Sequence, residues 1–153
     1  ILILATIAFP SYQAVISRIM KAKCMGNLRS LYTSFSSYVS DQGRWPQYHY
    51  KTDMLSQDYE SWWINKMTPY GATSETWLCP VLKALKLKGA NGKPLRMHYV
   101  PTQFDANPQS PYRWPTQPWI VETGNAHGDG ALIIFTNGSV KSMNEVVPNN
   151  VNP

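Results

Sequence analysis

A repeat of apolar residues runs through the first quarter of the chain. From residue 16 to residue 39, apolar side chains recur every three or four positions, which is the spacing of one face of an α-helix. Gly43 suits the C-cap of such a helix, and Pro46 cannot continue it. The pattern therefore predicts one long N-terminal helix over residues 1–40. The repeating residues are Ile16, Met20, Cys24, Leu28, Leu31, Phe35, Tyr38 and Val39.

The residues before this stripe are apolar on almost every side of the helix. They read ILILATIAF, and Pro10 follows. A membrane-spanning helix needs about 20 apolar residues, and a secretory signal would carry a basic start and a small-residue cleavage site. We interpret residues 1–10 as the C-terminal half of a longer apolar helix that begins upstream of Ile1. A helix over residues 1–39 would be about 58 Å long, so its first part should project beyond the domain, and Pro10 should kink or locally melt it.

The rest of the chain predicts a loop-rich middle and a small sheet. Residues 41–95 are irregular, aromatic and rich in proline, with one helix expected within residues 52–67 and a helical turn from Pro80 to Gly89. Strand patterns follow within residues 96–145 in RMHYVPTQF, PWIVETG and ALIIFTNGSVKSM, and residues 146–153 form a tail. This order indicates a single α+β domain over residues 1–153, with a protruding helix packed on an antiparallel sheet.

The last strand pattern contains a strong hairpin signal. The pair Asn137-Gly138 is typical of a two-residue turn, which would place Phe135 opposite Val140. Both faces of the strand before the turn are apolar, because its sequence is LIIF. We therefore expect the sheet to be covered on both sides.

Composition and motifs narrow the function classes. Charged residues make up 15% and aromatic residues 12% of the chain, which indicates an ordered fold. The net charge of +5 comes from basic residues in two separate stretches without an arginine-rich run, so nucleic acid is not expected as a partner. The sequence has no G-x-S-x-G, H-E-x-x-H or phosphate-loop motif. We expect neither an enzyme nor a cofactor.

Two stretches combine motifs beyond the helical and strand patterns. The first 46 residues join an apolar helix that runs into AFPSY, a basic amphipathic continuation, the segment CMGNLR and a Gly-x-x-Pro exit. In the C-terminal stretch GNAHGDGALIIFTNGSVKSM, a His- and Gly-rich segment precedes the hairpin. Both stretches resemble the type IV pilin and type II secretion pseudopilin superfamily, in particular its G-type pseudopilin-like members.

The resemblance implies a structural role. A prepilin is cut and N-methylated by a prepilin peptidase, held in the inner membrane, and passed by an assembly machinery into a homo-oligomeric helical filament at the cell surface. The alternatives are a type II secretion pseudopilin that works as a periplasmic piston, and a membrane-tethered monomeric binding module. The processing site is expected upstream of this sequence. The residues expected in the polymerisation and membrane helix are Ile1, Leu2, Ile3, Leu4, Ile7, Phe9 and Pro10.

The resemblance also bears on two candidate sites. An extracytoplasmic domain favours a disulfide between Cys24, on the helix stripe, and Cys79, in TWLCP; two buried free thiols are the alternative. Some G-type pseudopilins hold calcium in a C-terminal loop, where this chain offers Glu122 and Asp129. Calcium requires six or more oxygen ligands. We therefore prefer a plain turn without metal, in which His127 is solvated or hydrogen-bonded.

Overall fold

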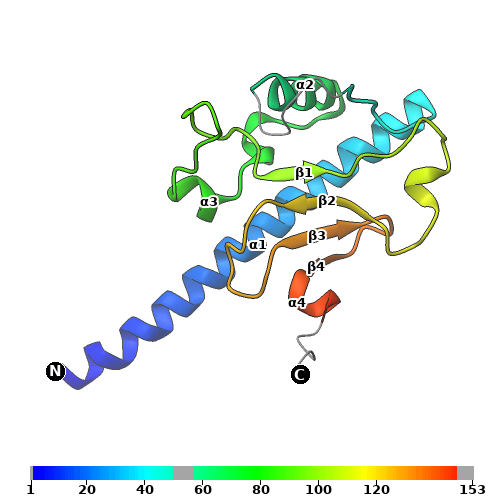
Figure 1. Cartoon of the computed structure of the whole chain (residues 1–153). Helices are drawn as coiled ribbons and strands as arrows, with labels where there is room; N and C mark the ends of the chain where they lie inside the picture. Colours follow the sequence, from blue (N-terminus) through cyan, green and yellow to red (C-terminus); the bar gives the residue numbers. More distant parts are fainter. Residues whose placement is uncertain (1, 50–56, 148–153) are drawn as a thin grey trace, which may run out of the picture.

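A long N-terminal helix, α1 (Leu2–Gln42), packs along the domain and extends past it (Figure 1). The computed structural model describes residues 2–49 and 57–147, and the side chains of α1 from Ser11 onward. α1 continues through Pro10 as one element. Gly43 ends it as predicted: its φ is 69°, and its N–H donates to the Val39 carbonyl at 2.8 Å. Within the described residues, no helix is both long enough and apolar enough to cross a membrane.

The apolar stripe of α1 is buried only in the C-terminal half of the helix. Cys24, Leu28, Leu31 and Phe35 are 0% exposed. Earlier residues of the same stripe are half-buried at most, and residues 11–15 are all exposed. The domain therefore covers α1 from about Cys24 onward, and the helix leaves it before that point, as Figure 1 shows.

Four short strands form an antiparallel sheet in the order β1-β2-β3-β4. All four residues of β3 are buried, which confirms the expectation of two apolar faces. α1 packs against β2, β3 and β4. The long helix and this sheet make the fold α+β, as the sequence predicts. The strands are β1 (Tyr99–Pro101), β2 (Pro118–Glu122), β3 (Leu132–Phe135) and β4 (Val140–Ser142).

The hairpin between β3 and β4 has a three-residue loop, so the predicted register was wrong by one residue. Ile134, not Phe135, pairs with Val140. The Gly138 N–H donates to the Phe135 carbonyl at 2.8 Å, and Gly138 has φ = 76°. Asn137 is not among the described residues with positive φ. A turn closed by one left-handed glycine thus replaces the two-residue turn, which needs positive φ at both positions.

The middle of the chain is more helical than expected. The helix predicted within residues 52–67 is α2 (Gln57–Met67), and residues 50–56 lie outside the described residues. The turn predicted after residue 80 is α3 (Pro80–Ala84). A fourth helix, α4 (Met143–Val146), begins where the last strand was expected to continue. Two short 3-10 helices also lie in the middle segment, η1 (Thr68–Tyr70) and η2 (Ser74–Trp77), and a third, η3 (Ser110–Tyr112), lies between β1 and β2.

Aromatic rings join the middle of the chain to α1. The Phe35 ring on α1 lies with its centroid 4.9 Å from that of Trp45, 5.5 Å from Trp63 and 6.2 Å from Trp77. All four side chains are 0% exposed. Trp45 in turn contacts Trp119 of β2 at 4.9 Å between ring centroids. α1, the middle segment and the sheet therefore share one hydrophobic core.

Candidate functional site

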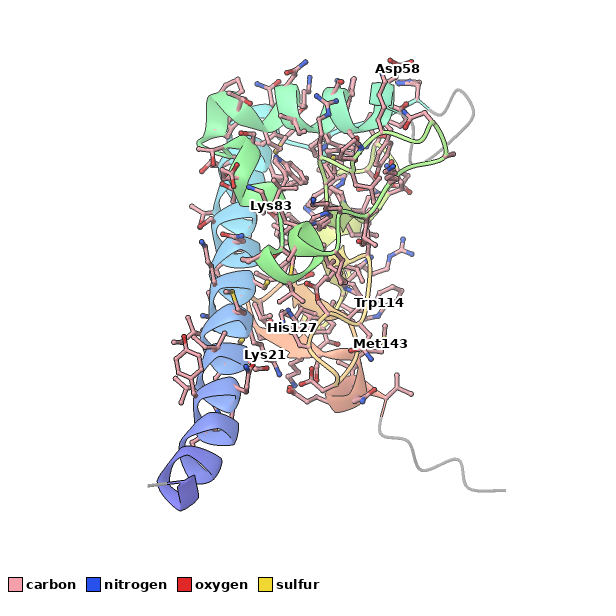
Figure 2. The ribbon with its side chains drawn as sticks, turned by 90° about the vertical axis from the view of Figure 1, so that its left-hand side faces the viewer. Lys21, Asp58, Lys83, Trp114, His127 and Met143 are labelled. Atoms are coloured by element: carbon pink, nitrogen blue, oxygen red, sulfur yellow. The ribbon has the colours of Figure 1, made fainter. Side chains whose placement is uncertain are left out.

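The part of α1 outside the domain exposes apolar side chains. Tyr12 is 62% exposed, Val15 51% and Ile19 54%. Their spacing of three and four residues places them on one face of the helix. Figure 2 shows this part of α1 separate from the rest of the molecule, below Lys21. An exposed apolar helix face of this kind is suited to burial against another apolar surface.

Of the residues expected in the polymerisation helix, those from Leu2 to Pro10 lie in the first turns of α1, and Ile1 is outside the described residues. Lys21 of α1 makes a polar contact with the sheet region. Its ammonium pairs with the carboxylate of Asp129, in the loop between β2 and β3. Lys21 lies three residues before the fully buried Cys24.

The two cysteines meet in the core, as the predicted disulfide requires. Cys24 faces inward from α1, and Cys79 is the N-cap residue of α3. Their Sγ atoms lie 2.7 Å apart, and both side chains are buried thiols. A disulfide needs about 2.05 Å between the sulfurs. The structure therefore brings the two sulfurs closer together than unbonded sulfurs normally lie, at a distance still longer than a disulfide, and the disulfide stays a prediction.

A carboxylate and an imidazole complete this cluster. Glu122 ends β2, and His127 follows in the Gly-rich loop; their side chains are 0% and 2% exposed. His127 Nε2 lies 3.5 Å from Glu122 Oε1 and 3.8 Å from Cys79 Sγ. One ligand atom from each of Cys24, Cys79, Glu122 and His127 lies within 4.8 Å of every other. We refer to these four residues as the Cys-His-Glu cluster.

The loop that delivers His127 is shaped by its own polar atoms. Asn125 Oδ1 accepts hydrogen bonds from the N–H groups of Gly128 and Gly130, at 2.9 and 3.0 Å. Both glycines have positive φ, at 85° and 93°. The turn therefore folds back after His127 and brings its ring over the cysteines.

Burial controls the electrostatics of the cluster. Removal from water, with the Cys79 thiol beside the carboxyl group, raises the pKa of Glu122 to about 7. The pKa of Cys79 is raised by its hydrogen bond with Cys24 and by burial. Glu122 Oε2 accepts a hydrogen bond from the Leu132 N–H at 3.1 Å. Within the described residues, Glu122 Oε1 has no hydrogen-bond partner.

The two carboxylates of the candidate calcium loop face different partners. Glu122 points into the Cys-His-Glu cluster, whereas Asp129 pairs with Lys21 and is not a member of the cluster. The side-chain oxygen of Asn125 is already occupied by two backbone N–H groups. That this loop is a plain turn without metal stays a prediction.

Sequence reasoning missed the association of His127 and Glu122 with the cysteines. The helix stripe predicts that Cys24 is buried, but the position of His127 depends on the path of a loop. The available signal was chemical: Cys, Cys, His and Glu are a ligand set, although their spacing matches no zinc motif.

The basic stretch over residues 83–96 contains Lys83, Lys86, Lys88, Lys93 and Arg96, and two of these cations are paired with carboxylates. Lys83 Nζ pairs with Glu75 at 2.9 Å. The Arg96 guanidinium lies 3.7 Å from the carboxylate of Glu60, which is itself buried and accepts the N–H groups of Arg96 and Met97. Lys83 and Arg96 therefore have structural partners within the domain.

Comparison of the chain with protein families, with curated proteins and with solved structures finds no match. The resemblance to pilins and pseudopilins therefore stays a prediction from the sequence.

Proposed function

We propose that this protein is a pilin-like structural subunit that polymerises through the N-terminal half of α1 into a helical filament at the cell surface. The observation that carries the proposal is the exposed apolar face of Tyr12, Val15 and Ile19, on a part of α1 that the domain does not cover. The domain built on the C-terminal half of the helix forms the outside of such a filament.

The length of α1 supports this arrangement. α1 has 41 residues, and the stretch before Cys24 is about 33 Å of helix at 1.5 Å per residue. Its first residues, LILATIAF, are almost all apolar. An apolar helix outside its domain is stable only in lipid or among other apolar helices. We infer that the inner membrane covers this end before assembly, and that staggered copies of α1 cover it in the filament.

The same geometry serves the alternative proposal, a pseudopilin of a type II secretion system. Both assemblies bury the N-terminal half of α1 and therefore share the same contact between subunits. They differ in the location and the length of the filament. Long filaments in the fraction sheared from the cell surface favour the pilus, and short periplasmic assemblies favour the pseudopilus.

A paired substitution on the exposed face tests the proposal. Val15→Glu with Ile19→Glu keeps good helix formers in α1. Each substitution puts a carboxylate into the proposed filament core, where an unpaired charge costs several kcal/mol. The two substitutions are introduced into the natural protein in the cells that produce it. We expect the ratio of sheared filaments to subunit in the membrane fraction to fall about tenfold or more below that of cells with the unchanged protein.

Leu85→Glu is the matched control. Leu85 is 64% exposed, on the globular part beyond α3, so the same change of side chain should leave the filament yield unaltered. Equal yields from the paired α1 variant and the Leu85 variant would contradict assembly through this face.

A further inference from the structure

We propose that the Cys-His-Glu cluster binds one zinc ion, with Cys24, Cys79, Glu122 and His127 as its four ligands. The inference is independent of filament assembly, because all four side chains lie inside one subunit. In Figure 2 the label of His127 lies beside α1, close to that of Lys21.

The ligand set is one that zinc prefers. Structural zinc sites are four-coordinate and use cysteine sulfur, histidine nitrogen and carboxylate oxygen. Two thiolates and an imidazole select a soft or borderline metal against calcium and magnesium, which take oxygen ligands. The cluster offers one such atom from each of four residues, all within 4.8 Å of one another.

The ligand atoms, all within 4.8 Å of one another, approach the spacing of a tetrahedral site, and local adjustment of the side chains would complete it. With zinc about 2.3 Å from sulfur and about 2.0–2.2 Å from nitrogen and oxygen, the ligand atoms of a tetrahedral site lie about 3.4–3.8 Å apart. His127 Nε2 is 3.5 Å from Glu122 Oε1 and 3.8 Å from Cys79 Sγ. The two sulfurs, now 2.7 Å apart, must separate by about 1 Å, which a small rotation of either cysteine side chain provides.

An unsatisfied carboxylate oxygen points to the ion independently. Glu122 is 0% exposed, and its Oε1 has no hydrogen-bond partner within the described residues, while Oε2 is held by the Leu132 N–H. The nearest charged neighbour of Oε1 is His127 Nε2 at 3.5 Å, without a hydrogen bond between them, and native structures rarely leave a buried carboxylate oxygen without a hydrogen bond. A cation among the four residues gives Oε1 its partner.

The site would connect elements that are distant in the sequence. Its ligands come from α1, the start of α3, the end of β2 and the loop between β2 and β3. The ion pair of Lys21 with Asp129 already joins that loop to α1 close to Cys24. A zinc ion would fix the same junction and so hold the long helix on the sheet.

Zinc and a disulfide between Cys24 and Cys79 exclude each other, because zinc requires both sulfurs as thiolates. This makes the redox state of the pair part of the test. The full chain is purified with a reductant that does not bind metal, its thiols are counted, and it is dialysed against a chelator and titrated with zinc sulfate. Bound metal is measured by mass spectrometry, and cobalt(II) is added separately to record the visible spectrum.

We expect one zinc ion per chain and, with cobalt, the spectrum of a tetrahedral thiolate complex. His127→Ala and Glu122→Gln should each weaken zinc binding by about 100-fold or more, since removing a ligand costs at least as much as removing a group that supports one. His49→Ala is the control: His49 is an exposed histidine outside the cluster, and its variant should bind zinc as the unchanged chain does.

Three results would overturn the proposal: a fully reduced chain that binds no zinc, zinc binding that His127→Ala leaves unchanged, and a Cys24–Cys79 disulfide in protein taken from its natural source. The cobalt spectrum of the unchanged chain needs no variant, so the test holds even where a substitution prevents folding. An unchanged, fully reduced chain that binds no zinc but still assembles into normal filaments would refute this inference alone.

Discussion

The ammonium group of Lys21 on α1 pairs with the carboxylate of Asp129, at the point where the helix leaves the domain. Both side chains are about a third exposed, at 31% and 37%. Water therefore screens the pair, and its contribution to stability is modest.

Breaking this ion pair should loosen the exit of α1 without unfolding the domain. We expect Lys21→Met to lower the free energy of unfolding by less than about 1 kcal/mol, and less at high salt. Urea denaturation at two salt concentrations measures the effect. A double-mutant cycle with Asp129→Asn isolates the coupling. A loss of several kcal/mol, or no coupling in the cycle, would contradict this description of the pair.

The glycines after His127 differ in what a side chain would meet. At Gly130, a Cβ would lie 2.7 Å from the Cβ of Met143, and φ is 93°. At Gly128, φ is 85° but nothing lies within 4 Å of the added atom. Gly128→Ala should therefore cost about 1 kcal/mol of unfolding free energy for the backbone strain, and Gly130→Ala about 2–3 kcal/mol.

Chemical denaturation of these two alanine variants measures the difference. The backbone strain is nearly the same at both sites. The difference in unfolding free energy between the two variants therefore reports the contact of the new Cβ at position 130 with Met143. Equal losses would show that the loop packs less closely against α4 than described.

The aromatic core should depend strongly on Phe35. Phe35→Ala removes a fully buried ring that contacts three tryptophans, and we expect a loss of about 3–5 kcal/mol in unfolding free energy. Near-ultraviolet circular dichroism should show the changed tryptophan environments. Tyr12→Ala is the control on the same helix: at 62% exposure it should leave the stability of the isolated subunit within about 0.5 kcal/mol. Similar losses in both variants would contradict the division of α1 into a buried and an exposed half.

Zinc should raise the thermal stability of the reduced chain. At a free zinc concentration of about 100 times the Kd, binding adds about 2.7 kcal/mol, which corresponds to a rise in Tm of about 5–10 °C for a chain of this size. Scanning fluorimetry with and without zinc measures the shift. Calcium serves as the comparison and should leave Tm unchanged, because the cluster presents sulfur and nitrogen to the ion. A rise with calcium and none with zinc would reverse the assignment.

The sequence predicts those parts of the fold that depend on the spacing of apolar residues and glycines within one element. The stripe from Cys24 to Phe35 repeats at helical intervals, and the same residues are buried. Gly43 ends the helix because a left-handed glycine closes its last turn. The LIIF strand is apolar at every position, and both of its faces are covered.

The predicted register was wrong at the hairpin because two turn geometries suit the same residues. Asn137-Gly138 fits a two-residue turn, but it also fits a longer turn in which only Gly138 takes positive φ, and the strand pairing selects the longer one. The Cys-His-Glu cluster could not be predicted for a different reason. His127 reaches Cys79 only because Asn125 bonds to the backbone beyond it, and this loop path is set by tertiary contacts with α1 and α4.

In the proposed filament, subunits assemble through the half of α1 that the domain leaves uncovered. Cryo-electron microscopy of filaments sheared from cells that produce the natural protein tests it most directly. We expect a helical polymer of this chain in which Tyr12, Val15 and Ile19 pack against neighbouring copies of α1, with the sheet on the outside. A polymer in which these side chains face solvent, or sheared material without any polymer of this chain, would contradict it.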